Sequence, residues 1–209
     1  MIIKKTKILI VYDNGKCLPY SNLLEYPMYP IEIIREYYNP ESEAYKFLVQ
    51  HSRMVAKKAV EVAERVKHLN PNIKFIEEAA MLHDIGIFLT HAPHIGCHGD
   101  KPYICHGYLG RELLEKKGYP KHAIVCETHV GVGLSTKDIE KNNFPLPRRV
   151  MMPTTIEEKI VCFADKFFSK DNELLKEKPI SKVRESIARF GDDKLKQFDE
   201  WLKLFKETE

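Results

Sequence analysis

The chain has 209 residues, of which 44% are hydrophobic and 30% charged, a composition that is ordinary for a soluble globular protein. Its 33 basic and 30 acidic residues leave a net charge of +3, so charge alone gives no reason to expect binding to a nucleic acid polymer. No apolar run is long enough to span a membrane, and no cleavage site follows the short apolar run at residues 8–12. We therefore expect a cytoplasmic protein with reduced cysteines.

The first thirty residues predict little regular structure. Residues 7–12 are apolar and β-branched, and Asn14-Gly15 follows them, so we expect a short strand that turns into a hairpin. Three prolines interrupt residues 18–30, and this segment is expected to be irregular.

From residue 30 onward the pattern is helical. Asn39-Pro40 is a start signal for a long helix, expected from about residue 41 to residue 66. Its apolar positions recur at spacings of three and four once His51 is counted among them. Thr155 and Glu158 have the spacing of a capping box. Further helices are expected at residues 74–84, 106–117, 121–130, 155–169, 181–190 and 192–206, and a loop is expected at residues 88–105.

The chain is therefore expected to be an all-α protein in three parts. These are an N-terminal extension (residues 1–39), a helical domain (40–170) and a C-terminal helical tail (171–209). The two amphipathic helices of the tail carry large apolar side chains: Phe190, Phe198, Trp201, Leu202 and Phe205. We expect these side chains to pack on the same domain, and the alternative is a contact between the two copies of a homodimer.

Six polar residues lie on the apolar faces of five predicted helices. They are His51, His83, Asp84, His106, His129 and Asp165. A single buried histidine is usually a hydrogen-bonded core residue, but six buried polar groups would each need a partner. A shared divalent cation satisfies all of them at once, and imidazoles with carboxylates suit Zn, Mn or Fe. Helical bundles commonly build such metal sites from facing helices.

The order of these residues resembles a known family. His51, then the run Ala79-Ala80-Met81-Leu82-His83-Asp84-Ile85-Gly86, then Ala164-Asp165 resembles the H…HD…D pattern of the HD-domain superfamily of metal-dependent phosphohydrolases, in its HDIG branch. The resemblance covers about residues 40–170 and implies an all-helical HD domain. It also implies that four residues bind one metal ion: His51, His83, Asp84 and Asp165.

Family members with two metal ions have two further histidines between the HD pair and the last aspartate. His106 in His-Gly-Tyr-Leu-Gly and His129 in Glu-Thr-His-Val-Gly match those positions, which implies a binuclear site with Asp84 as the bridging ligand. The six-residue order is similar to that of small HD proteins and of HD-type dinucleoside tetraphosphate hydrolases. Two divalent ions are expected, most often of Fe, Mn or Zn, and Mg or Ni would also fit.

The resemblance implies hydrolysis of a phosphate ester or anhydride, and the expected substrate is a small nucleotide. Neither a nucleic acid polymer nor a membrane is expected as a partner. Metal-bound water becomes a hydroxide nucleophile near neutral pH, and the ions also neutralise phosphoryl charge. Asp84 would hold the metals and orient that nucleophile. Lys166, beside Asp165, and Lys101, ahead of His106, are the candidates for binding substrate phosphate, with Lys166 assigned a catalytic role as well.

Two other functions fit the same residues. HD-type di-iron oxygenases share the six-ligand pattern, and oxygen uptake would distinguish them from hydrolases. A non-catalytic module that binds a nucleotide and regulates a partner would show binding without turnover. The complete set of six ligand-type residues argues against the regulatory module, because binding alone does not require it.

Overall fold

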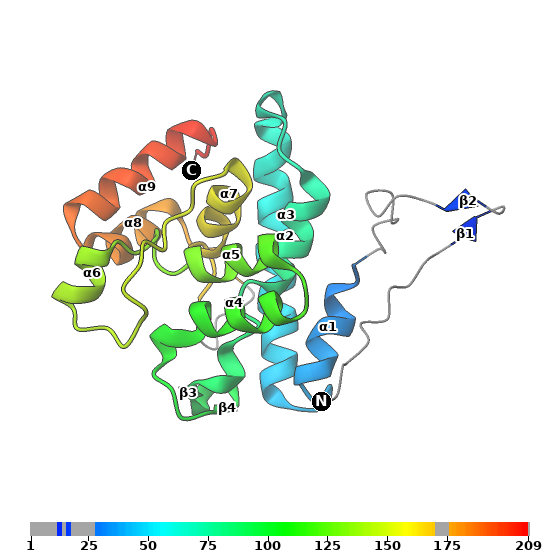
Figure 1. Ribbon diagram of the computed structural model, residues 1–209. Coiled ribbons are helices and arrows are strands. Elements are labelled where there is room, and N and C mark those ends of the chain that lie inside the picture. The colour runs from blue at the N-terminus through cyan, green and yellow to red at the C-terminus, as the bar shows by residue number, and fades with distance from the viewer. Residues whose placement is uncertain (1–11, 14–15, 18–27, 170–175, 209) are drawn as a thin grey trace.

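The computed structural model describes residues 12–13, 16–17, 28–169 and 176–208. These residues form helices and two small hairpins (Figure 1). The α-helices are α1 (Pro30–Tyr37), α2 (Glu43–Arg65), α3 (Ile73–Leu82), α4 (His106–Lys116), α5 (Pro120–Thr128), α6 (Thr136–Lys141), α7 (Ile156–Asp165), α8 (Ile180–Ala188) and α9 (Asp192–Leu204). The 3₁₀ helices are η2 (Lys67–Leu69), η3 (Ile87–Leu89), η4 (Pro93–Ile95) and η5 (Tyr103–Cys105), and the strands are β1 (Tyr12–Asp13), β2 (Lys16–Cys17), β3 (His91–Ala92) and β4 (Cys97–His98). The all-α fold class expected from the sequence is confirmed.

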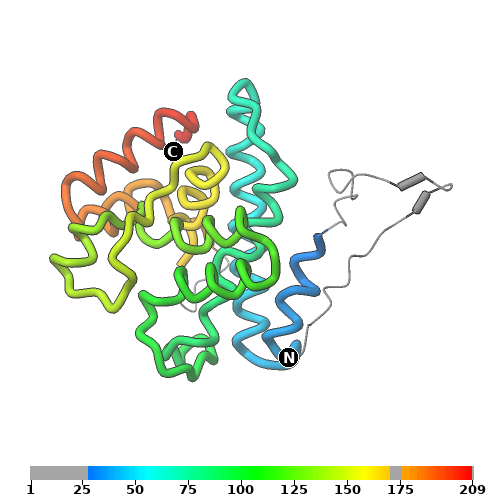
Figure 2. The backbone as a smooth tube through the Cα atoms, in the orientation of Figure 1, coloured from blue at the N-terminus to red at the C-terminus, as the bar shows by residue number. Residues whose placement is uncertain are grey.

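The long helix α2 forms one side of the bundle, against α3 and α7. Its apolar stripe is buried along the whole length, and His51 occupies one position of that stripe with no exposed surface. Because side chains three and four residues apart lie on one helix face, the stripe carries His51 into the interior between α3 and α7. Figure 2 follows the backbone from α1 through α2 and α3 into α4 and α5.

Helix α7 is the central helix of the bundle and contacts α2, α3, α5 and α9. Five consecutive residues of this helix, 160–164, are fully buried, so the helix is enclosed on every side. Asp165 is its last residue. A buried central helix therefore delivers this carboxylate to the inside of the molecule.

The C-terminal helix α9 covers α7. The ring of Phe163 on α7 lies 5.3 Å from that of Phe198 and 5.0 Å from that of Phe205, measured between centroids. Phe198, Trp201 and Phe205 are buried as expected for a tail that packs on the core, whereas Phe190 is 72% exposed, contrary to expectation. Phe190 lies in the turn between α8 and α9, where its side chain faces solvent.

Helix α9 also holds the loop that follows α5. The buried Lys194 donates from Nζ to the carbonyl oxygen of Gly133 (3.2 Å) and to Asp138 Oδ2 (2.6 Å). Gln197 donates from Nε2 to the carbonyl oxygen of Val132 at 3.0 Å. The C-terminal tail thereby fixes the segment that leaves the α5 end of the bundle.

The N-terminal part of the described chain contributes to the bundle as well. Helix α1 packs against α3, although the sequence division places it in the N-terminal extension. Tyr38 donates from its hydroxyl to the carbonyl oxygen of Ile85 (2.7 Å) and accepts from the Phe88 N–H (3.2 Å). These bonds hold the turn after α3. The predicted first hairpin is confirmed where Tyr12 pairs with Cys17; residues 7–11 and 18–27 lie outside the described residues.

Two predicted helix starts differ in their details. The side chain of Ser42, not that of Asn39, accepts the N–H of Tyr45 and caps α2, because Asn39 is used in the preceding turn. Thr155 caps α7, but the expected capping box does not close. The Glu158 carboxylate accepts the N–H of Thr154 instead of that of Thr155.

Several short elements were not predicted. Helix α1 lies in the part expected to be an N-terminal extension. Residues 88–105 were expected to be a loop, yet they contain the hairpin of β3 and β4, the 3₁₀ helices η4 and η5, and most of η3. Helix α6 was missed, although Ser135 and Asp138 form a closed capping box at its start. These elements are too short to show a clear hydrophobic period. None of the helices within the described residues has the length and apolar composition needed to cross a bilayer.

Gly86, which follows Ile85, provides space for helix α4. A Cβ at this position would lie 2.3 Å from the carbonyl oxygen of His106 and 2.5 Å from the amide nitrogen of Gly110. The φ of Gly86 is −82°, which any residue adopts, so the close approach of α4 is what requires glycine. We expect Gly86→Ala to lower the free energy of unfolding by roughly 3 kcal/mol, measured by urea denaturation.

Gly118→Ala is the matched control. Its Cβ would have no atom within 4 Å, but its φ of +85° is unfavourable for alanine. The expected loss there is about 1 kcal/mol from the left-handed backbone alone. A loss in Gly86→Ala no larger than in Gly118→Ala would contradict the close-approach argument.

Candidate metal centre

Five of the six candidate ligands lie at helix ends. His51 is the exception, inside α2. The others are His83 and Asp84 after the last residue of α3, His106 at the start of α4, His129 after the last residue of α5, and Asp165 at the end of α7. All six are buried, with at most 6% of their surface exposed. The fold therefore brings together the six residues that the sequence singled out.

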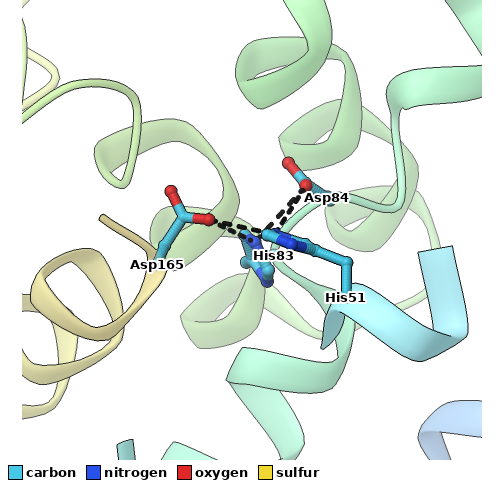
Figure 3. Close-up of side chains that lie close together, drawn as sticks. All are labelled: His51, His83, Asp84 and Asp165. Carbon is cyan, nitrogen blue, oxygen red and sulfur yellow. Dashed lines mark hydrogen bonds and ion pairs between the residues drawn. The ribbon is translucent and has the colours of Figure 1, made fainter. Parts of the chain in front are cut away.

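The first group of side chains surrounds one oxygen of Asp84 (Figure 3). Asp84 Oδ2 lies 3.4 Å from Nε2 of His51 and 3.4 Å from Nε2 of His83. Asp165 Oδ1 lies 3.0 Å from Nε2 of His51 and 3.4 Å from Nε2 of His83. Two imidazoles and two carboxylates thus face a common point.

The second group surrounds the other oxygen of the same carboxylate. Asp84 Oδ1 lies 3.3 Å from Nε2 of His106 and 3.2 Å from Nε2 of His129. The two Nε2 atoms are 3.1 Å apart. Asp84 therefore belongs to both groups, one oxygen to each.

Backbone carbonyls fix the orientation of three of the imidazoles. In each, Nδ1 bonds to the carbonyl oxygen of the residue three positions earlier: His83 to Ala80 (2.6 Å), His106 to Tyr103 (2.7 Å) and His129 to Cys126 (2.7 Å). An Nδ1 that donates its proton leaves the Nε2 lone pair directed into the cluster, and this is the usual support of a metal-ligating histidine.

Helix orientation adds to the field at the cluster. The C-terminal ends of α3, α5 and α7 carry His83, His129 and Asp165. The carbonyl end of a helix has partial negative charge and favours a nearby cation, by about 0.3–1 kcal/mol for each helix end. Three such ends together favour positive charge inside the bundle.

The two histidines that flank Asp84 have pKa values shifted in opposite directions. Burial lowers the pKa of His83, but the carboxylates of Asp84 and Asp165 outweigh burial and raise this pKa to about 9. Burial lowers the pKa of His129 to about 4. An ion bound in the first group would therefore compete with a proton on His83.

The residues fit divalent metal ions. His83 Nε2 is fully buried, and the groups that face it are the carboxylates of Asp84 and Asp165, each at 3.4 Å. Buried carboxylates are costly unless a positive charge balances them, which a bound cation would supply. The donor set is four imidazole nitrogens and the oxygens of two carboxylates, the mixture that suits Zn, Mn or Fe. The chain thus has a cluster of histidines and aspartates that can bind metal.

The two candidate phosphate-binding lysines have different surroundings. Lys166 donates from Nζ to Asp165 Oδ2 (2.8 Å) and to the carbonyl oxygen of His129 (3.0 Å), so it holds two of the candidate ligands in place. Lys101 is exposed, pairs with Asp100 at 3.1 Å and does not line the cavity beside the cluster, so its position gives no support to its prediction as a substrate-binding residue. The charge of Lys101 is directed to solvent.

A cavity of about 570 Å³ lies beside the cluster. His106, His129 and Asp165 line it, together with Lys166. Its remaining lining residues include Tyr103, Phe168, Ser169, Lys178, Val183, Ser186 and Ile187. No sequence motif marks Lys178 or Ser186, because their position depends on how the C-terminal segment folds back on the domain.

Comparison with known proteins identifies the family. A family model described as HD domain matches residues 48–169. The chain is 34% identical over 121 residues to an uncharacterized protein of Methanocaldococcus jannaschii, and this alignment covers 56% of this chain and 64% of that protein. It is 26% identical over 157 residues to the tRNA (cytidine(56)-2'-O)-methyltransferase of Thermoplasma volcanium (75% and 42%) and 30% identical over 125 residues to that of Picrophilus torridus (59% and 32%).

The chain spans less than two thirds of the length of each of these three relatives. Among solved structures, the HD domain of the L. monocytogenes phosphodiesterase PgpH aligns with a TM-score of 0.48 and 17% identity, over 85% of this chain and 95% of that one. The same domain in complex with cyclic-di-AMP gives a TM-score of 0.48 and 18% identity, over 85% and 93%. The family match covers more than half of the chain and contains all six candidate ligands, and the chain therefore belongs to the HD domain family.

Proposed function

We propose that the chain is a metal-dependent phosphohydrolase that cleaves a phosphate ester or anhydride of a small nucleotide. The observation that carries this proposal is the position of Asp84 between two sets of metal-ligand side chains, next to a cavity. His51, His83, Asp84 and Asp165 would hold one ion, and Asp84, His106 and His129 would hold a second. Two bound ions would supply a nucleophile at neutral pH and neutralise charge on the phosphoryl group.

The residues of the chain would position the substrate and the ligands. His106, His129 and Asp165 line the cavity, so a phosphoryl group in it can reach the candidate ligands from one side. Lys166 forms an ion pair with Asp165 Oδ2, so the other carboxylate oxygen, Oδ1, faces His51 and His83. We assign Lys166 a positioning role, because its ammonium group already contacts two of the candidate ligands.

The test is metal content by mass spectrometry on protein purified without added metal. We expect about two ions per chain in the wild type. His106→Ala should retain about one, because it removes a ligand of the second group and leaves the first group intact. Phosphate release from a panel of nucleotides should fall in the same variant. Two ions retained in His106→Ala would contradict the assignment of His106.

The same preparation distinguishes the competing chemistries. Oxygen consumption with a diol or phosphonate, without phosphate release, would favour an HD-type oxygenase. Nucleotide binding without turnover in the metal-loaded protein would favour a regulatory module. The two lysines that line the cavity suit an anionic phosphate and favour a phosphate-bearing ligand over a neutral diol.

Two relatives are named for methylation of tRNA, and this chain spans less than half of each. We do not extend methyl transfer to this chain. Their names justify adding a tRNA with a terminal phosphate to the substrate panel. Its hydrolysis in preference to free nucleotides would replace the small nucleotide in the proposal with an RNA end.

A further inference from the structure

The cavity beside the metal cluster has a wall that lies outside the family match. The match ends at residue 169. Four lining residues come from the segment after it, and together they are called the C-terminal wall: Lys178, Val183, Ser186 and Ile187. The metal cluster belongs to the shared domain, whereas this wall is supplied by the part of the chain that follows it.

The C-terminal wall is firmly attached to the bundle. The N–H of Lys178 donates to the carbonyl oxygen of Phe167 at 2.8 Å, two residues beyond the candidate ligand Asp165. Its neighbour Glu177 accepts from Nζ of the buried Lys58 at 2.6 Å. Val183 is 1% exposed and belongs to the main hydrophobic core. The wall therefore keeps a fixed position relative to the end of α7.

The wall combines one cation with apolar and hydroxyl groups. Two lysines, Lys166 and Lys178, occur among the described residues that line the cavity. Lys178 contributes its positive charge from the wall. Val183 and Ile187 present apolar side chains beside it, and Ser186 is exposed on the same helix. A charged group next to an apolar surface suits a ligand with an anionic end and an organic end.

We infer that the C-terminal wall determines substrate specificity: Lys178 binds the phosphoryl group, and Val183, Ser186 and Ile187 contact the organic group attached to it. The inference rests on the proposed function, since it assumes that a phosphate compound occupies the cavity. Ammonium groups bind phosphate through charge-assisted hydrogen bonds, which are stronger than neutral ones.

The first test measures binding of inorganic phosphate to the metal-loaded full chain by calorimetry. Lys178→Gln should weaken this binding by about 10-fold or more, the effect of losing one hydrogen bond to a charged group, with metal content unchanged. Lys182→Gln is the matched control, because Lys182 is an exposed lysine of α8 that pairs with Glu185 and does not line the cavity. It should bind phosphate like the wild type.

The second test concerns the organic group. Ser186→Trp places a large ring in the cavity at an exposed position, so the core stays intact. It should raise KM for the best nucleotide by about 10-fold or more while leaving the affinity for inorganic phosphate near that of the wild type, because only the longer ligand meets the ring. An unchanged KM in Ser186→Trp would overturn the assignment of the organic group to the wall.

These measurements separate the inference from the proposed function. Phosphate binding that is lost in Lys178→Gln supports the inference even when no substrate is turned over. Phosphate binding that is unchanged in Lys178→Gln, or absent from the wild type, overturns it even when nucleotides are hydrolysed.

Discussion

Replacing Asp84 with asparagine should remove both of the proposed metal ions from the chain and lower the proposed phosphohydrolase activity by at least about 1000-fold. The carboxylate has no exposed surface, and each of its oxygens faces a different group of candidate ligands. An asparagine of the same shape loses the negative charge and offers a single acceptor oxygen. Metal ions contribute several kcal/mol to phosphoryl transfer, and each 1.36 kcal/mol is a factor of ten in rate. Metal content and initial rate are measured on the same preparation.

Glu127→Gln is the matched control for Asp84→Asn. Glu127 is also a buried carboxylate, 1% exposed, but it accepts hydrogen bonds from Arg111 and Arg149 and belongs to neither group of candidate ligands. Its replacement should destabilise the protein while metal content per folded chain stays at the wild-type level. Two ions in Asp84→Asn would contradict the role of Asp84 as the shared ligand.

The candidate site was predictable because its residues break local patterns. His51 continues the buried stripe of α2, where a polar residue is costly, so spacing alone brought it to notice. His83 and Asp84 follow an apolar helix and precede Gly86, where the chain must turn close to α4. The expected helix bounds already placed His83, Asp84, His106 and His129 at or next to helix ends. Asp165 was expected inside a helix over residues 155–169, whereas α7 ends at it, because helix boundaries are set by caps and tertiary contacts rather than by hydrophobic period.

The candidate phosphate-binding lysines were harder to predict for a physical reason. Lys101 and Lys166 were chosen because they lie near candidate ligands in the sequence. Lys166, which is next to Asp165 in the sequence, lies beside the candidate site, whereas Lys101 is exposed to solvent. Lys178 lies twelve or more residues from each of the candidate ligands, and its N–H bonds to the carbonyl oxygen of Phe167, just beyond α7, where it lines the cavity. A side chain on a long flexible stem has no periodic signature, so its target depends on the tertiary fold.

Phe198→Ala should lower the free energy of unfolding of the whole chain by about 3–5 kcal/mol. The side chain of Phe198 is fully buried, and its ring lies 5.3 Å from that of Phe163 and 6.2 Å from that of Phe167, both on the segment that carries Asp165. Removing it leaves a cavity between α9 and α7 that neighbouring side chains cannot fill. Urea denaturation followed by circular dichroism measures the loss, and one cooperative transition is expected if the C-terminal tail folds with the domain.

Phe190→Ala provides the comparison, because the same side chain is 72% exposed there and its removal should change the free energy of unfolding by less than about 0.5 kcal/mol. The outcome also bears on the C-terminal wall of the cavity, since α8 packs against α9 and changes when α9 loosens. Weakened phosphate binding in Phe198→Ala at temperatures where the chain is still folded would connect the two regions. Two separate unfolding transitions, or an unchanged midpoint of urea denaturation in Phe198→Ala, would instead show that residues 176–208 form a unit independent of the helical domain. The C-terminal wall would then lack the rigid support that substrate selection requires.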